Sequence, residues 1–277
     1  CISPRGYVPP PELAEPVPGQ TIDAVSRIAR ERRCYIICPL VTKREGQLFN
    51  SAVVIGRSGE IVGIYDKLQP VTSSPQYTEF EGGIAPGRDL PVFDLDFGRI
   101  AIQICFDAGF SHNWRKLADK DVRAVFWCSA YNGGFMLQAY AALHQYHVIS
   151  SVRSSKSRFI DPCGRVTAQT GGQVDVIWRD INLDFAVCHS DFNYALPERI
   201  AAKYGPRVNI QGDVDTATLY IEPVDPAITI AHLQQEFGFE TWKQYMSRHV
   251  CALGKISRGE NPEPQQALHG DRPMYTK

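Results

Sequence analysis

The sequence lacks an excess of charge of either sign. Its 277 residues include 29 Lys and Arg against 30 Asp and Glu, so the formal net charge is −1. Proteins that bind nucleic acids need clustered basic residues to replace the counterions of the phosphates. Here the basic residues are scattered among acidic ones along the whole chain. We therefore expect no nucleic-acid partner.

The sequence also lacks a long hydrophobic run, a signal-peptide pattern and a Cys-x-x-Cys pair. Without an apolar run of membrane-spanning length or a basic-then-apolar start, we expect no membrane partner. The eight cysteines lie mostly inside apolar runs such as CYIIC and VFWCSA, which is typical of small buried thiols in a reducing compartment. These features predict a soluble, cytoplasmic protein without a disulfide framework or a zinc site.

What is present is an alternation of short strands and amphipathic helices. Ile22, Val25, Ile28 and Ala29 recur at helical spacing behind Thr21, which predicts a helix over 21–33 that leads into an apolar strand. A second helix is expected over 135–146. Strands are expected over 34–41, 50–56, 61–68, 91–98, 99–105, 122–129, 147–152, 157–160 and 165–170. The pattern favours an α/β fold with parallel and antiparallel strands.

The pattern changes after about residue 225. An amphipathic helix is predicted over 230–249, followed by the polar segment SRGENPEPQQALHGDRP. A polar segment rich in Pro and Gly buries little apolar surface and is typical of a swinging or partner-binding extension. We therefore expect one large domain over residues 1–225 and a helical extension with a polar tail over 226–277, which the chain length permits.

Cys105 lies where a predicted strand stops. The stretch GRIAIQICFDAGF carries the strand up to Cys105 and then continues with Phe106, Asp107, Ala108 and Gly109, which do not extend it. A thiol at such a strand-to-turn junction projects from the sheet edge, where free backbone N–H groups can face a substrate. A cysteine at the end of an apolar strand can also be an ordinary core residue, but the turn that follows favours a nucleophile.

Lys67 and Glu81 are candidate partners of this cysteine. A thiolate nucleophile needs a nearby positive charge or a base. Lys67 closes the predicted strand that begins at Ile61, and Glu81 precedes a glycine-rich loop. A lysine at a strand end is most often a surface residue. Residues at strand ends and in adjoining loops can nevertheless converge in an α/β fold although they are distant in sequence.

Four motifs occur in a characteristic order: GEIVGIYDKLQP, EGGIAPGRDLPVFDLDFGRIAIQICFDAGF, VFWCSAY and DPCGRVTAQTG. In this order and spacing the chain resembles the carbon–nitrogen hydrolase family, the nitrilase superfamily, over roughly residues 15–225. The resemblance implies a four-layer α-β-β-α sandwich that commonly dimerises face to face. It therefore implies a homodimer or a higher homo-oligomer.

The resemblance also implies roles for individual residues. Cys105 matches the nucleophile of a Glu-Lys-Cys triad, Lys67 matches the lysine, and Glu81 matches a second glutamate that supports the lysine. The backbone N–H of Phe106 would help to stabilise the oxyanion. The implied reaction is hydrolysis of non-peptide C–N bonds in small amides or N-carbamoyl compounds through a thioester, with no metal or organic cofactor. Asp107 follows Phe106 here, whereas nitrilases tend to have Trp-Glu after the cysteine, which favours an amide over a nitrile.

One family feature is not identifiable, namely the first glutamate, which acts as the general base. The chain opens with CISPRGY, about where a strand ending in Leu-Pro-Glu should finish. We expect the first strand, the first helix and this base to precede Cys1. The alternatives are that Glu12 or Glu15 serves, or that the protein is an inactive relative that binds or assembles. The prolines that follow Cys1 argue against an N-terminal-nucleophile hydrolase.

Tyr131 and Asn132 are the predicted substrate contacts beyond the triad. They follow the strand over 122–129, on the same side as Cys105 in the topology of the family, although their position is equally compatible with a plain loop. His144 and His147 lie near the end of the predicted helix without a carboxylate or a third ligand. A zinc site needs three or four ligands, so we expect no metal there.

Overall fold

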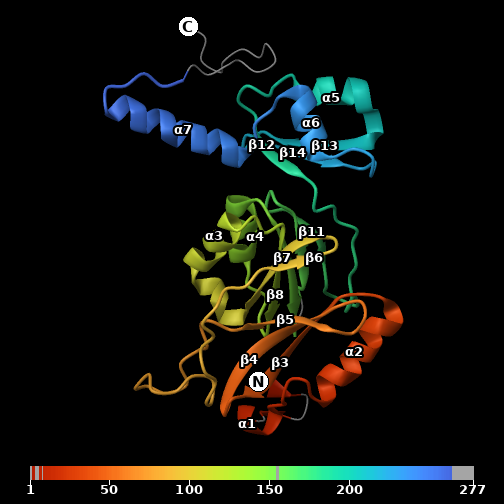
Figure 1. Ribbon diagram of the computed structural model, residues 1–277, viewed down its shortest axis with the longest axis vertical. Helices are drawn as coiled ribbons and strands as arrows, with labels where there is room; N and C mark the ends of the chain where they lie inside the picture. The colour runs from red at the N-terminus through yellow and green to blue at the C-terminus, as the bar shows by residue number, and fades with distance from the viewer. Residues whose placement is uncertain (1, 4–5, 8, 154–155, 264–277) are drawn as a thin grey trace. The chain divides into compact units, whose positions relative to one another are not determined.

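Two sets of sheets organise the chain in the computed structural model, which describes residues 2–3, 6–7, 9–153 and 156–263. They belong to two compact units, residues 1–179 and residues 180–277 (Figure 1). The elements of the first unit are β1 (Ile2–Ser3), β2 (Gly6–Tyr7), α1 (Pro10–Leu13), α2 (Gln20–Arg32), β3 (Ile36–Arg44), β4 (Gln47–Ile55), β5 (Ile61–Asp66), β6 (Phe93–Leu95), β7 (Gly98–Ile104), the 3₁₀ turn η1 (Cys105–Gly109), α3 (Ser111–Asp119), β8 (Ala124–Ser129), α4 (Phe135–His144), β9 (His147–Val152), β10 (Arg158–Ile160) and β11 (Val166–Gln169).

The smaller of the two main sheets of the first unit is antiparallel, in the order β3-β4-β5. Its first hairpin pairs Arg44 with Gln47 across the two-residue loop Glu45-Gly46. Both loop residues have positive φ, 51° and 76°, which matches the right-handed twist of the flanking strands and favours glycine at the second position. The local sequence Glu-Gly thus sets the register of β3 against β4.

The larger sheet has the order β11-β10-β9-β8-β7-β6 and brings three parallel strands to its centre. Ile104 of β7 is paired with Cys128 of β8, and Cys128 is paired with Ser151 of β9. Because these strands run in the same direction, their carboxyl ends meet at one edge of the sheet. The residues that follow each strand, beginning with Cys105, are therefore neighbours in space.

Helices cover the outer faces of both sheets. On the smaller sheet, Ile22 and Ala29 of α2 pack against Val53 and Ile55 of β4. On the larger sheet, α3 and α4 place side chains such as Leu137 in a core with residues of β7, β8 and β9. The inner faces of the sheets meet where the Gln103 side chain donates a hydrogen bond to the Tyr65 hydroxyl at 3.0 Å. The predicted four-layer α-β-β-α sandwich is confirmed.

The second unit has its own sheet and core. Its elements are β12 (Ala186–His189), α5 (Leu196–Tyr204), the 3₁₀ turn η2 (Gly205–Arg207), β13 (Val208–Asp213), β14 (Thr218–Pro223), α6 (Ile230–Phe237) and α7 (Trp242–Ser257). The three strands form an antiparallel sheet in the order β12-β14-β13. Its core joins Ile221 of β14 to Ile200 of α5 and Leu233 of α6.

The single helix predicted over 230–249 is in fact two helices. Gly238 ends α6 in the left-handed region, with φ 71°, and its N–H donates to the Gln234 carbonyl. Thr241 then begins α7 with a reciprocal capping box to Gln244. A left-handed glycine ends one helix, and a threonine cap three residues later begins another. The apolar periodicity continues across this break, so the periodicity alone predicted a single helix.

The predicted division between residues 225 and 226 differs from the division between the two compact units at residues 179 and 180. The physical reason is that β12, β13 and β14 pair with one another and pack on α5 and α6. Part of the predicted polar tail, residues 264–277, lies outside the described residues. Within the described ranges, no helix combines the length and the apolar character that crossing a bilayer requires.

Two leucines of α4 test the packing of this helix on the larger sheet. Leu137 is fully buried and Leu143 is 70% exposed. We expect Leu137→Ala to lower the free energy of unfolding by about 2–5 kcal/mol, because it leaves a cavity in the core. Leu143→Ala is the matched control, with an expected change below about 0.5 kcal/mol. Urea unfolding measures both, and equal effects would contradict the described packing of α4.

Candidate active site

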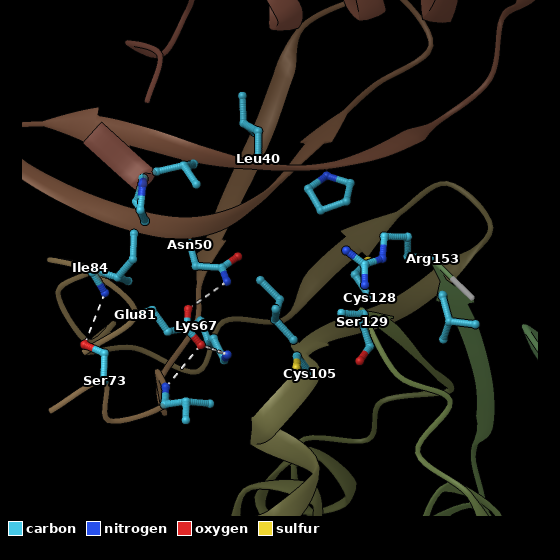
Figure 2. Close-up of a pocket in the computed structure, with 18 of the residues that line it drawn as sticks. Leu40, Asn50, Lys67, Ser73, Glu81, Ile84, Cys105, Cys128, Ser129 and Arg153 are labelled. Carbon is cyan, nitrogen blue, oxygen red and sulfur yellow. Dashed lines mark hydrogen bonds and ion pairs between the residues drawn. The ribbon is translucent and has the colours of Figure 1, made fainter. Parts of the chain in front are cut away.

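A cavity of about 710 Å³ lies at the carboxyl ends of β7, β8 and β9. Strands β3 and β4 and the loop that follows β5 complete its wall. Its charged lining residues are Lys67, Glu81 and Arg153, and Cys105 lines it as well. Figure 2 shows these side chains together with Asn50, which contacts Glu81. The predicted nucleophile, lysine and supporting glutamate are therefore brought into one cavity.

Cys105 occupies an unusual backbone conformation. It is the first residue of η1, directly after β7, and its φ is 51°. A non-glycine residue in the left-handed region is uncommon and persists where the surrounding structure holds it. Its carbonyl accepts hydrogen bonds from the Trp127 indole N–H at 3.2 Å and from the Tyr131 hydroxyl at 3.4 Å. The strand stops at Cys105 because the backbone turns sharply at this residue.

A buried carboxylate holds this turn in place. Asp107 accepts hydrogen bonds from the Ile104 N–H at 2.9 Å, the Gln69 N–H at 2.9 Å and the Tyr65 hydroxyl at 2.7 Å. Burial raises the pKa of Asp107, and these three hydrogen bonds act against that rise. Ile104 precedes Cys105, and Gln69 lies two residues after Lys67 in the chain. One side chain thus ties the turn at Cys105 to the segment that carries Lys67.

Lys67 and Glu81 form an ion pair at the wall of the cavity. The Lys67 side chain is 1% exposed, and its Nζ contacts Glu81 Oε1. The Asn50 amide donates to Glu81 Oε2 at 3.1 Å, and the Val71 N–H donates to Oε1 at 3.1 Å. Partial burial acts to raise the pKa of Glu81, but the charge and hydrogen bond of Lys67 and the hydrogen bonds from Asn50 and Val71 together outweigh it, so the pKa lies below its ordinary value. Glu81 therefore stays ionised and fixes the position of the buried ammonium group.

The remaining predicted site residues lie outside the cavity lining described here. The Phe106 side chain is 42% exposed and packs edge-on against Phe110, with ring centroids 5.6 Å apart; its backbone N–H lies in the first turn of η1. Tyr131 is 45% exposed and contacts the Cys105 carbonyl. The Asn132 side chain accepts from the Gly134 N–H at 3.0 Å, just before α4. Substrate contact by Tyr131 and Asn132 stays a prediction.

The two glutamates considered as replacement bases lie elsewhere. The Glu15 carboxylate accepts hydrogen bonds from the backbone N–H and the hydroxyl of Thr21, in the first turn of α2. Glu12 is exposed on α1. Among the described residues that line the cavity, Glu81 is the one carboxylate. The Glu15 carboxylate is therefore engaged by the first turn of α2, and neither glutamate is among the residues that line the cavity.

Asn50 and Arg153 are two lining residues that the sequence analysis did not single out. Asn50 pairs with Glu81 from β4, and Arg153 directly follows β9. The sequence contained a signal for Arg153, namely a charged residue directly after the strand predicted over 147–152. Asn50 carried no such signal, since it lies inside a strand, and it meets Glu81 only because the loop after β5 runs back along β4, where Leu48 and Ile84 form a bridge.

We next consider the surroundings of His144 and His147, at which no metal was expected. In the part of the chain that the structure describes, no group of three or more His, Cys, Asp or Glu side chains converges around a common point. His144 stacks on Tyr140, with ring centroids 6.1 Å apart and planes 11° from parallel. His147 is buried at the start of β9. Packing accounts for both positions.

Comparison with known proteins places these features in a family. The sequence model of the family described as carbon-nitrogen hydrolase matches residues 3–187. The omega-amidase NIT2-A of Xenopus laevis is 25% identical over 205 residues, which is 66% of this chain and 74% of the relative. The omega-amidase NIT2 of Homo sapiens is 25% identical over 203 residues, which is 65% of this chain and 73% of the relative.

Solved structures share the fold. A carbon-nitrogen hydrolase from Helicobacter pylori G27 superposes with a TM-score of 0.53 at 18% identity, covering 59% of this chain and 66% of that one. Nit3 of Saccharomyces cerevisiae, a member of branch 10 of the nitrilase superfamily, superposes with a TM-score of 0.50 at 14% identity, covering 84% of this chain and 75% of that one. At these identities the likeness concerns the fold alone.

The Lys67–Glu81 pair predicts a pH-dependent stability. Glu81→Gln leaves the buried Lys67 ammonium without its counterion. We therefore expect the free energy of unfolding at pH 7 to be about 1–3 kcal/mol lower in Glu81→Gln than in the wild type. In the folded state the pKa of Glu81 is lowered from its ordinary value of 4.5. The extra stability of the wild type over Glu81→Gln is therefore fully present above pH 4.5 and is lost as the pH falls through the lower folded-state pKa. Urea unfolding from pH 7 to pH 3 measures it. Glu79→Gln, at an exposed position, is the control, and a pH-independent difference would contradict the pairing.

The hydrogen bonds of Asp107 predict a second loss of stability. Asp107→Asn keeps the size of the side chain but replaces one accepting oxygen by an NH₂ group, which must face the N–H of either Ile104 or Gln69. We expect the free energy of unfolding to fall by about 1–3 kcal/mol, since one buried donor loses its partner. Thermal and urea denaturation measure the change. If Asp107→Asn were as stable as the exposed control Asp89→Asn, the carboxylate would not hold the turn.

Proposed function

The chain belongs to the carbon-nitrogen hydrolase family, and on that premise we propose that it hydrolyses small amides with Cys105 as the nucleophile. One observation carries the proposal: the left-handed turn at Cys105 opens into the same cavity as the buried Lys67–Glu81 pair. An activated nucleophile and a fixed positive charge in one enclosed site are the elements that acyl transfer requires.

The proposed cycle has two halves. The Cys105 sulfur attacks the carbonyl carbon, and the negative charge on the oxygen is stabilised by Lys67 and the Phe106 backbone N–H. The C–N bond then breaks, the amine leaves with a proton, and a thioester remains on Cys105. Water attacks this thioester, releasing the carboxylic acid and restoring the thiol. Because Lys67 and the Val71 N–H bind the Glu81 carboxylate, we assign Glu81 the support of Lys67 rather than the removal of a proton.

Small amides or N-carbamoyl compounds are the proposed substrates, in preference to nitriles. The support comes from Phe106-Asp107 after the cysteine and from the omega-amidases among the relatives. A cavity of about 710 Å³ is within the usual range for small-molecule sites. The proposed reaction needs no metal or organic cofactor.

Several of the other cysteines differ from the proposed nucleophile in the pKa or the exposure of their thiol groups. Burial raises the pKa of Cys128 to about 12 and raises those of Cys38 and Cys188 as well, so these thiols are poor nucleophiles at neutral pH. Cys251 is exposed on α7 and is the thiol that non-specific reagents reach most easily. A reagent that resembles the substrate is therefore needed to distinguish Cys105.

We expect one acyl group on Cys105 after incubation with an activated ester such as p-nitrophenyl acetate, observed by intact-mass spectrometry and located by peptide mapping. Cys105→Ala should remove the adduct, and Cys251→Ser should leave it. The same Cys105→Ala protein should lose ammonia release from small amides by at least about 10³-fold, since no other group replaces the nucleophile. Ammonia release from nitriles but not from amides, or acylation that persists in Cys105→Ala, would contradict the proposal.

A further inference from the structure

Helix α7 is anchored to the second unit by residues near its start. Tyr245 stacks on His189 of β12, with ring centroids 4.9 Å apart, and its hydroxyl donates a hydrogen bond to Asp191 at 2.9 Å. Trp242 contacts the same histidine ring, with centroids 5.0 Å apart. Of the 16 residues of α7, all of which the structure describes, Tyr245 is the one that is buried. Figure 1 shows the helix extending from this anchor away from β12.

An apolar stripe runs along the rest of the helix. Its members are Met246, Val250, Leu253 and Ile256, which are between 38% and 71% exposed. Residues three or four positions apart lie on the same side of a helix, so these side chains form a continuous apolar strip, here called the α7 stripe. Contiguous exposed apolar surface is rare in soluble monomers and marks interaction sites.

The basic residues near the α7 stripe are already neutralised within the chain. The ion pairs are Arg248 with Glu240 at 2.9 Å, Lys255 with Glu263 at 3.1 Å, and Arg258 with Glu260 at 2.7 Å. An anionic membrane or a nucleic acid attracts a helix through basic residues whose charge is not already compensated. The pairing therefore favours an occupant that is itself apolar and has little net charge.

The α7 stripe is complementary to a second copy that runs in the opposite direction. Met246, Val250 and Leu253 follow one another at spacings of four and three residues, and Ser257 continues the series after four more. Alternating steps of three and four residues form the seam between two paired helices. In an antiparallel pair centred between Val250 and Leu253, each Val250 faces the partner's Leu253. Each Met246 then faces the partner's Ser257.

The same register brings opposite charges together at both ends of the seam. Lys243 lies three residues before Met246, and Glu260 lies three residues after Ser257. Both are exposed. In the antiparallel pair, Lys243 of each copy faces the partner's Glu260. In a parallel pair each would face its own counterpart, so that like charges would repel. Charge complementarity thus selects the antiparallel arrangement.

We propose that α7 is a self-association surface on which the α7 stripe of a second copy of this chain packs antiparallel. The inference is independent of the proposed amidase function, and α7 lies outside residues 3–187, which match the family model. The contact uses the same patch on both copies, so it joins two copies and then closes.

The proposed contact is small. A helix of 16 residues is about 24 Å long and about 10 Å wide. One such pair therefore buries less than the roughly 1,200–2,000 Å² that is typical of stable specific interfaces. We expect a dissociation constant on the order of 10–100 μM.

Sedimentation velocity of the full chain between about 5 and 500 μM tests the proposal. The weight-average mass should rise with concentration, and Leu253→Glu should prevent the rise, because it places a carboxylate in an apolar seam. Ile28→Glu, at an exposed apolar position of α2, is the matched control, and circular dichroism should show that both variants keep the fold.

The outcome is also defined when another surface already joins two copies. The α7 step then appears as an increase from dimer to tetramer, and Leu253→Glu removes that step alone. A mass that does not change with concentration, or a rise that persists in Leu253→Glu, would overturn the proposal.

Charge reversal tests the direction of the pair. Lys243→Glu brings a carboxylate opposite the partner's Glu260, so we expect the dissociation constant to rise about 3- to 10-fold. Adding Glu260→Lys to the same chain restores opposite charges and should return the constant to within about twofold of the wild type. In a parallel pair like charges face each other in all three proteins. Equal association by the three proteins would therefore overturn the antiparallel arrangement.

Disulfide formation tests which residues face each other. Chains for this test also carry Cys251→Ser, because Cys251 is an exposed thiol on the same helix. An equimolar mixture of Val250→Cys and Leu253→Cys chains should form mixed disulfides at least about fivefold faster than either chain alone forms disulfides, since a disulfide needs close Cβ atoms. Mixed disulfides that form no faster than those of the separate chains would overturn the proposed register.

Discussion

The carboxylate of Asp107 is the constraint on which the geometry of the cavity depends. It binds the backbone just before Cys105 and the backbone just after Lys67, and it does so from a buried position. A buried carboxylate is costly unless its hydrogen bonds are satisfied, and here three donors satisfy it, including the Tyr65 hydroxyl. The arrangement of Cys105 relative to Lys67 thus follows from one satisfied polar group.

The charged side chains that line the cavity are the Lys67–Glu81 ion pair and Arg153. Burying Lys67 requires a partner, because an isolated ammonium group in a protein interior is strongly unfavourable. Glu81 supplies that partner and in turn is held by Asn50 and the Val71 backbone. The pair is neutral as a whole, and it holds the Lys67 ammonium group at the wall of the cavity that Cys105 also lines. Arg153, which directly follows β9, is the third charged residue among the described residues of the lining.

Much of the fold and of the candidate site could be predicted from the sequence. The strand periodicity and the turn residues indicated an α/β fold, and the family resemblance carried by the four ordered motifs implied the sandwich, which the structure confirms. Cys105, Lys67 and Glu81 were all expected and lie in one cavity. The helix break at Gly238 and the separate sheet of the second unit were not anticipated, because periodicity reports which face of an element is apolar and not which elements pack together.

What the sequence by itself determined was local: where strands stop, where turns need positive φ, and which residue types at strand ends have nucleophilic or charged chemistry. Only the tertiary structure decided which of these groups meet. It brought Asn50 to Glu81 and Arg153 to the cavity of Cys105, and it assigned Glu15 to the first turn of α2. The physical reason is that parallel pairing of β7, β8 and β9 and the stacking of two sheets are long-range contacts. Their register sets the distances between side chains, and no short stretch of sequence contains it.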